Sequence, residues 1–159
     1  MQQCLLKEFL PKNLRGGSKM PYFVVHEHHA RNLHFDLRLE KDGVLKSWAL
    51  PKGPSMNPAD KRLAIMVEDH PLDYGDFEGV IPEGHYGAGK VYIWDKGEYS
   101  TVKGSIEEGQ WEINMNGDIL KGNFVLIKLK GRDDQWLFIK KKDKFADYNF
   151  KLFYRTIEK

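Results

Sequence analysis

The 159-residue chain has little cysteine: its one thiol, Cys4, rules out a disulfide within the chain. A single thiol is also too few for a zinc finger or a cysteine-ligated iron–sulfur cluster. Disulfides are rare in reducing compartments, so the cysteine count agrees with such a compartment.

Long apolar runs are missing as well. No stretch approaches the roughly 20 residues that a membrane-spanning helix needs, and the first residues, MQQCLLKEFLPK, do not follow the signal-peptide pattern. Hydrophobic residues make up 41% and charged residues 30% of the chain, as in ordinary soluble domains. We therefore expect a cytoplasmic protein in which residues 1–159 form one domain. Residues 1–20, with Gly16-Gly17-Ser18, are expected to be a flexible N-terminal arm.

The chain carries little net charge, +2, but its charges are segregated. Residues 1–65 hold 11 Lys and Arg against 6 Asp and Glu, residues 66–118 hold 3 against 12, and residues 119–159 hold 11 against 5. This pattern could form a basic groove beside an acidic zone that attracts metal ions. It is equally compatible with charges that decorate opposite faces of a barrel.

Short strands separated by Gly, Asp, Asn and Pro account for most of the chain. The expected strands are Tyr22–His28, Leu33–Glu40, Val44–Leu50, Arg62–Glu68, Lys90–Asp95, Gln110–Met115, Asn123–Lys130 and Gln135–Lys141. A helix is expected at most near Asp143–Tyr148. Eight short strands with tight turns predict an all-β fold, an antiparallel β-barrel or sandwich, in which closure would remove exposed edges.

Polar and apolar residues alternate from Leu33 to Leu39. Because successive side chains of a strand point to opposite faces, we expect His34, Asp36 and Arg38 on one face. The other face is expected to anchor the strand in the core through Leu33, Phe35, Leu37 and Leu39. An imidazole and a carboxylate spaced in this way can share a divalent cation, and the arginine can bind a phosphate oxygen on that cation.

A further metal donor is expected from the preceding strand, which ends in His26-Glu27-His28-His29. The short connection Ala30-Arg31-Asn32 could bring one of these histidines back to the metal. The sequence pattern does not show whether this is His26, His28 or His29. The competing interpretation is a solvated sheet face that carries polar residues by chance. The arginine in phase and the upstream histidines argue against it.

A second polar cluster lies in Val67-Glu68-Asp69-His70-Pro71-Leu72-Asp73-Tyr74-Gly75. His70 could donate to a phosphoryl oxygen or protonate a leaving group, because imidazole changes charge near neutral pH. Tyr74 could add a neutral hydrogen bond. Taken alone, both residue types more often have structural roles, and the same holds for Lys52 and Arg62.

The segment Gly84-His-Tyr-Gly-Ala-Gly89-Lys90 matches the start of a nucleoside-triphosphate loop, G-x-x-x-x-G-K. Val91, however, replaces the Ser or Thr that holds magnesium, and residues 91–94 have the pattern of a strand where a helix is required. We expect these glycines to shape a loop between strands, in reach of the substrate.

These segments together resemble a known family. FVVHEHHARNLHFDLRLEKDGVLKSWALPKGPS, KRLAIMVEDHPLDYGDFEGVIPEGHYGAGKVYIWDKG and WLFIKKKD are similar to the 3′-phosphoesterase domain of bacterial DNA ligase D. More closely, the chain resembles the stand-alone versions found in archaea. The resemblance is dense from Phe23 to about Gly97.

The resemblance implies a closed or nearly closed barrel of about eight strands, with a groove for the 3′ end of a primer. It implies a manganese-dependent enzyme, with Co²⁺ or Zn²⁺ as other metals, that removes a 3′-terminal ribonucleoside and then the 3′-phosphate. The 3′-hydroxyl that remains is ready for ligation in DNA repair by non-homologous end joining.

The resemblance also assigns roles to residues. The metal ligands would be His28, His34 and Asp36. The scissile phosphate would be held by Arg38 and His70, with support from Tyr74. The secondary contributors would be Glu68, Lys52 and Arg62. In the N-terminal arm, Glu8 and Arg15 are possible counterparts of functional residues of the family.

The expected partners are the 3′ ends of DNA, or of RNA-terminated DNA, in a primer-template, and a separately encoded ligase or polymerase. We expect a monomer that has no membrane partner. Two other functions fit the same residues. A non-catalytic module that binds nucleic-acid ends would keep its binding when metal is removed. A barrel acting on a small molecule would need a ligand set made mostly of histidines in an enclosed pocket.

Overall fold

The computed structural model describes residues 20–155, which form nine β-strands and one short 3-10 helix, η1. The strands are β1 (Tyr22–His29), β2 (Leu33–Lys41), β3 (Val44–Leu50), β4 (Arg62–Pro71), β5 (Gly79–Ile81), β6 (Gly89–Ser105), β7 (Gln110–Gly117), β8 (Lys121–Lys128) and β9 (Gln135–Lys140), and η1 is Leu72–Asp76. Within residues 20–155 there is no α-helix and no helix able to span a membrane. The expected N-terminal arm, with Glu8 and Arg15, lies outside the described residues except for Met20.

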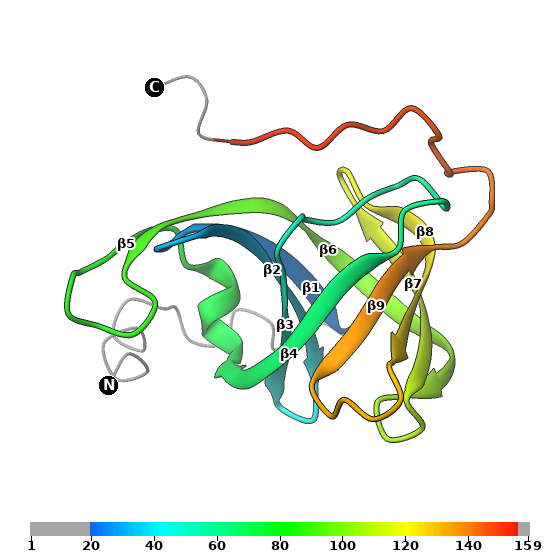
Figure 1. Ribbon diagram of the computed structural model, residues 1–159, viewed down its shortest axis with the longest axis horizontal. Coiled ribbons are helices and arrows are strands. Elements are labelled where there is room, and N and C mark those ends of the chain that lie inside the picture. The colour runs from blue at the N-terminus through cyan, green and yellow to red at the C-terminus, as the bar shows by residue number, and fades with distance from the viewer. Residues whose placement is uncertain (1–19, 156–159) are drawn as a thin grey trace.

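Eight of the strands close into an antiparallel barrel (Figure 1). The order around the barrel is β1-β2-β3-β4-β9-β8-β7-β6, and β6 pairs back with β1. β5 lies outside the ring and pairs with the first residues of β6. The expected all-β barrel of about eight strands is therefore confirmed, and β5 and η1 are additions that the sequence pattern did not predict.

The longest strand, β6, closes the ring because it serves two neighbours. Its first half pairs with β1, and its second half, from Gly97 onward, pairs with β7. The sequence pattern placed the end of this strand at Asp95, because a glycine such as Gly97 is typical of a strand end. That prediction was wrong. In the structure β6 passes so close to the backbone of Asn116 that a Cβ atom at position 97 would collide with it. Glycine keeps the strand continuous at this point.

The barrel interior is filled by large apolar side chains. Trp48 is fully buried and packs against Trp111 and Trp136, with ring centroids 6.5 and 5.8 Å away. Phe35, Leu37 and Leu39 of β2 enter the same core as expected, whereas Leu33 is 40% exposed because it begins the strand beside the β1–β2 turn. The even-numbered residues of β2 therefore face outward from the barrel.

A second, smaller core lies on the outer wall of the barrel. It contains Tyr22, Val24, Leu45 and Tyr74, with Leu72, Phe77 and Ile93 packed against it. The residues from 72 to 81 belong to η1, β5 and their connection, which Figure 1 shows at the left of the barrel. This excursion covers part of the outer wall, so polar residues of β1 and β2 on that wall are enclosed between two layers.

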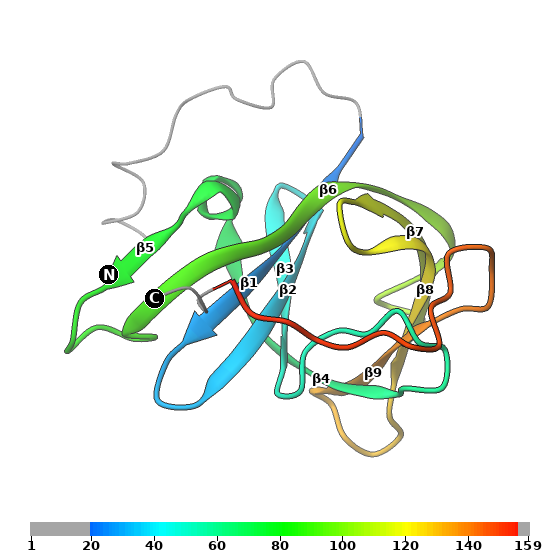
Figure 2. The same ribbon diagram turned by 90° about the horizontal axis from the view of Figure 1, so that it is seen from above.

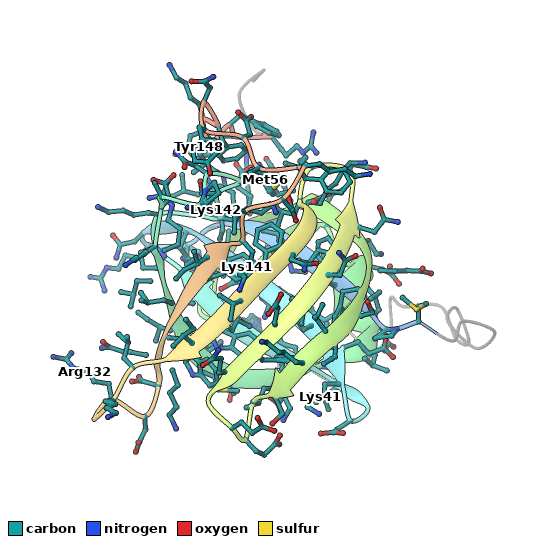
Figure 3. The ribbon with its side chains drawn as sticks, turned by 90° about the vertical axis from the view of Figure 1, so that its right-hand side faces the viewer. Lys41, Met56, Arg132, Lys141, Lys142 and Tyr148 are labelled. Carbon is teal, nitrogen blue, oxygen red and sulfur yellow. The ribbon has the colours of Figure 1, made fainter. Side chains whose placement is uncertain are left out.

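The helix expected near Asp143–Tyr148 was wrong: this part of the chain forms two successive turns. The Asp143 carboxylate accepts a hydrogen bond from the Phe145 N–H at 2.9 Å, and the Asp147 carboxylate accepts one from the Asn149 N–H at 2.9 Å. Such local bonds from Asp to the backbone compete with helix formation. Figure 3 shows Tyr148 near Met56, whose carbonyl accepts a hydrogen bond from the Asp147 N–H at 3.0 Å.

Beyond these turns, residues 150–155 run in an extended path along the barrel (Figure 2). Phe150 and Leu152 pack against the interior core. The indole N–H of Trp94 donates to the Phe153 carbonyl at 2.9 Å, and Arg155 donates to the Trp94 carbonyl. The segment thereby shields the core beside the start of β2.

Candidate metal and phosphate site

The β1–β2 hairpin brings two imidazoles and a carboxylate together on the outer wall. His28 and His34 are opposite each other in the strand register, with ring centroids 4.8 Å apart. Oδ2 of Asp36 lies 3.3 Å from Nδ1 of His28 and 3.4 Å from Nε2 of His34. One ligand atom from each of the three residues lies within 4.8 Å of the others. Two imidazoles and a carboxylate suit a divalent transition metal, so the triad could hold such an ion.

Backbone carbonyls fix which nitrogen of each ring can bind a metal. Nε2 of His28 lies 2.7 Å from the Gly87 carbonyl oxygen, and Nδ1 of His34 lies 2.9 Å from the Asn32 carbonyl oxygen. Because a carbonyl only accepts, those two nitrogens carry protons. The other nitrogen of each ring faces Asp36 and is the one that can serve as a ligand atom. Such outer partners hold metal-binding histidines in orientation.

The other two histidines of the β1 motif have different partners. His26 is fully buried, with Nδ1 facing Nε of Arg38 at 3.0 Å and Nε2 facing the Phe77 carbonyl at 3.1 Å. Nε2 of His29 lies 2.8 Å from the buried Glu27 carboxylate. Among the described residues, the triad therefore takes His28 from this motif.

Arg38 lies beside the triad and is held from several sides, with only 3% of its surface exposed. Its Nε donates to His26, one Nη donates to the Ser47 hydroxyl at 3.0 Å, and the other donates to Asp36 at 3.3 Å. Nη1 also lies 3.3 Å from Nδ1 of His70. A guanidinium fixed in this way needs no reorganisation to meet an anion at the triad.

Charges within the site are strongly coupled. Burial alone would raise the pKa of Asp36, but the Arg38 charge and hydrogen bonds from His28 and His34 outweigh it and hold the pKa well below its usual range. Burial and the Arg38 charge lower the pKa of His70 to about 4, so this ring is neutral near pH 7. The resting site therefore holds the ionised carboxylate of Asp36, the guanidinium of Arg38 and the neutral imidazole of His70.

His34 differs from His70 because it faces the carboxylate. Burial opposes its protonated form, but the hydrogen bond and charge of Asp36 prevail and raise the pKa of His34 above 6.5. A metal must displace this proton. We expect Mn²⁺ affinity to fall as the pH drops through the His34 pKa, by about tenfold per pH unit. Calorimetric titration from roughly pH 5.5 to 8 measures this dependence, and an affinity that stays constant over the range contradicts it.

The triad and Arg38 line one pocket of about 320 Å³. Its lining residues are His28, Ala30, His34, Asp36, Arg38, Ala49, Val67, His70, Tyr74, Ile81, Tyr86 and Gly87. The lining contains both polar and apolar residues. Asp36 is the only acidic residue in this lining, so the acidic excess of residues 66–118 does not build the pocket.

Tyr74 comes from η1 and closes the pocket beside the arginine. Its ring centroid lies 4.9 Å from Cζ of Arg38 and 4.9 Å from the His70 ring centroid. Burial raises the pKa of Tyr74, so its hydroxyl stays protonated and can donate a hydrogen bond. The structure thus brings six of the residues predicted from sequence into one pocket: His28, His34, Asp36, Arg38, His70 and Tyr74.

The structure does not bring Lys52, Arg62 and Glu68 into that lining. Lys52 is exposed in the β3–β4 connection, and Arg62 forms an ion pair with Asp60 at 3.6 Å. The Glu68 side chain is exposed, while its carbonyl oxygen lies 3.2 Å from Nδ1 of His70. Their functional roles remain predictions.

Sequence reasoning missed the partners that hold Arg38. Ser47 is a small polar residue within the apolar strand β3, and His26 is in phase with His28 on β1. Both patterns signal polar groups on the outer wall, but only the register of the strands pairs them with the arginine. The Gly87 carbonyl is 59 residues away from His28 in sequence, and no feature of the sequence indicated this contact.

His26 is expected to position Arg38. The change His26→Leu removes the acceptor of the Arg38 Nε–H and leaves this buried donor unpaired, so affinity for inorganic phosphate should fall by about tenfold. His26→Gln keeps an acceptor and a donor and should retain most of the affinity. Calorimetric titration of each variant with phosphate, and separately with Mn²⁺, checks this. Equal phosphate affinity in the Leu variant, or an equal loss of Mn²⁺ affinity, argues against the role.

The fold and the site together define a closed β-barrel protein whose outer wall carries a candidate metal triad beside a buried arginine. Comparison with known families gives the particular family. Residues 26–128 match the model of the DNA ligase D 3′-phosphoesterase domain, and the chain belongs to this family. By family it is a phosphoesterase, a hydrolase of phosphate esters.

Similar curated proteins are much longer than this chain. It is 51% identical over 126 residues to the "Multifunctional non-homologous end joining protein LigD" of Pseudomonas aeruginosa, which covers 76% of the chain and 15% of that protein. It is 43% identical over 145 residues to the protein of the same name in Mycolicibacterium smegmatis, which covers 86% of the chain and 19% of that protein. The chain thus spans less than a fifth of the length of these relatives.

Proposed function

We propose that this protein is a metal-dependent 3′-end-healing phosphoesterase of DNA repair by non-homologous end joining. It removes a 3′-terminal ribonucleoside from DNA or an RNA-terminated primer and then removes the 3′-phosphate. The observation that carries the proposal is the position of Arg38, buried and oriented beside a triad able to hold a metal. The names of the relatives and the family description support the choice of substrate.

The triad would hold Mn²⁺, and Co²⁺ or Zn²⁺ suit the same donors. A bound divalent ion supplies Lewis-acid polarisation of a phosphoryl oxygen and offsets negative charge. The oriented lone pairs of His28 and His34 and the ionised Asp36 are the donor set for it.

The chain's own groups then act on the phosphate. Arg38 binds non-bridging oxygens and stabilises the charge that builds during attack by water. Neutral His70 donates a hydrogen bond to the phosphoryl group, a role that its lowered pKa favours over that of a proton donor to the leaving oxygen. Tyr74 adds a neutral donor. In the monoester step water adds to phosphorus and the ester oxygen leaves with a proton, which yields a 3′-hydroxyl and inorganic phosphate.

Other residues complete the proposal. Glu68, Lys52 and Arg62 would be secondary contributors, and Lys52 and Arg62, outside the pocket lining, would contact the nucleic acid beyond the scissile phosphate. A neighbouring 2′-hydroxyl would take part in the ribonucleoside step. The protein would act as a cytoplasmic monomer, and a separately encoded ligase or polymerase would use the healed end.

The test is an incubation of the protein with Mn²⁺ and a labelled primer-template that ends in one ribonucleotide. We expect a 3′-phosphate product first and a 3′-hydroxyl product later, and neither when the metal is chelated. Binding that survives chelation without any product would instead support the non-catalytic end-binding module.

A further inference from the structure

Tyr86 is an exposed residue beside the candidate metal triad. It is 69% exposed, the largest fraction among the large hydrophobic residues that the structure describes. It nevertheless lines the pocket of the metal triad and Arg38. An exposed aromatic ring that lines a pocket is accessible to a ligand that enters it.

The chain around Tyr86 is held in place rather than free to adjust. The His85 N–H donates to the Pro82 carbonyl at 3.2 Å, and the Ala88 N–H donates to the His85 carbonyl at 3.1 Å. Gly87, with φ of 75°, adopts a left-handed conformation that favours glycine. Its carbonyl oxygen accepts the 2.7 Å hydrogen bond from His28. The ring is therefore one residue away from a direct link to a metal-ligand candidate.

The lining of the pocket points to a ligand of mixed chemistry. Its polar members, Arg38 and the triad, suit a phosphate. Its apolar members are the small and branched side chains of Ala30, Ala49, Val67 and Ile81, together with the exposed Tyr86. A volume of about 320 Å³ exceeds what a phosphate fills. A nucleoside attached to the phosphate matches this division, because a base has a planar face that stacks on an aromatic ring.

We propose that Tyr86 is a nucleobase-binding platform, on which the base of the nucleoside that carries the scissile phosphate at its 3′ oxygen stacks. The inference rests on the proposed function and adds to it a binding element outside the metal and phosphate groups. That nucleoside is common to the diester and the monoester substrates, so both reactions use the same platform. Stacking accepts any base, so the platform provides affinity without sequence preference.

Two variants and two substrates test the platform. The substrates are DNA strands with a 3′-phosphate that carry either a base or an abasic site at the terminal nucleoside. For the wild type, removal of the base is expected to lower kcat/KM by about 5- to 100-fold, the range of one base–aromatic stack. Tyr86→Ala lowers kcat/KM by the same factor on the normal strand and by little on the abasic one. Tyr86→Phe keeps the ring and behaves as the wild type.

Tyr148→Ala is the matched control, because Tyr148 is also an exposed tyrosine, at 57%, and lies outside the pocket lining. It is expected to match the wild type on both strands. If Tyr86→Ala lowers kcat/KM equally on the normal and the abasic strands, or on neither, the platform is overturned while the phosphoesterase function stands.

A binding measurement separates the platform from catalysis. A 3′-phosphate strand with terminal 2-aminopurine is titrated with protein and Mn²⁺, and its fluorescence is followed. Quenching in the wild type that is lost in Tyr86→Ala and retained in Tyr86→Phe supports the platform even where no phosphate is released. Binding without quenching, or no binding by the wild type, overturns it.

Discussion

The Asp36→Asn variant is expected to lose Mn²⁺ binding and, with it, phosphoesterase activity. Asp36 contacts both histidines of the triad through one oxygen, so the amide removes the anionic ligand common to both. Loss of a residue that only hydrogen-bonds to a metal ligand costs about 10- to 100-fold in metal affinity. Loss of Asp36, which is a direct ligand candidate, should cost more. Calorimetric titration with Mn²⁺ and a 3′-phosphate release assay measure the two effects.

Asp36 also stabilises the fold, so a second variant separates the two roles. Asp36 is buried and lies 3.3 Å from Nη2 of Arg38, and removal of one partner of a buried pair costs about 3 to 5 kcal/mol. His34→Ala removes a ligand and leaves this ion pair intact. It should keep a thermal midpoint near that of the wild type and still lose metal binding. Unchanged Mn²⁺ affinity in His34→Ala would show that the triad is not the metal site.

The Arg38→Lys variant is expected to lose about 10³-fold in turnover while it keeps its metal affinity within about tenfold. A lysine retains the positive charge but cannot donate to His26, Ser47 and Asp36 from one rigid plane. The charge would then lie in a different place relative to the phosphate. Phosphate release and Mn²⁺ titration on the same preparation distinguish this loss from loss of metal.

Arg132→Ala is the matched control for the arginine. Arg132 is exposed in the β8–β9 turn, at the lower left in Figure 3, and donates to Gln135 at 3.2 Å. This variant is expected to be fully active. Turnover by Arg38→Lys at the wild-type rate would show that Arg38 does not have the proposed role in the reaction.

Local patterns predicted those parts of the site that depend on one hairpin. The alternation in β2 placed His34, Asp36 and Arg38 on one face, and a three-residue turn sufficed to bring a histidine of β1 opposite His34. The choice of His28 was only partly local. It follows from the engagement of His26 with Arg38 across the hairpin, and from two carbonyls distant in sequence, that of Gly87 at His28 and that of Phe77 at His26.

The elements that sequence reasoning missed are short or depend on tertiary contacts. β5 has three residues and η1 has five, too few for a periodic pattern. The helix expected near Asp143–Tyr148 failed because aspartate side chains bond to nearby backbone N–H groups. The excursion that contains β5 and η1 covers the outer wall. It turns an exposed sheet face into a pocket.

The most direct test of the central claim compares two phosphates on one DNA strand. The same oligonucleotide is prepared with a phosphate at its 3′ end or at its 5′ end, and inorganic phosphate release is followed with Mn²⁺ and with a chelator. We expect release from the 3′-phosphate strand, only with metal, and none from the 5′-phosphate strand. Equal release from both strands, release that persists with chelator, or no release from either would contradict the proposed 3′-phosphoesterase activity.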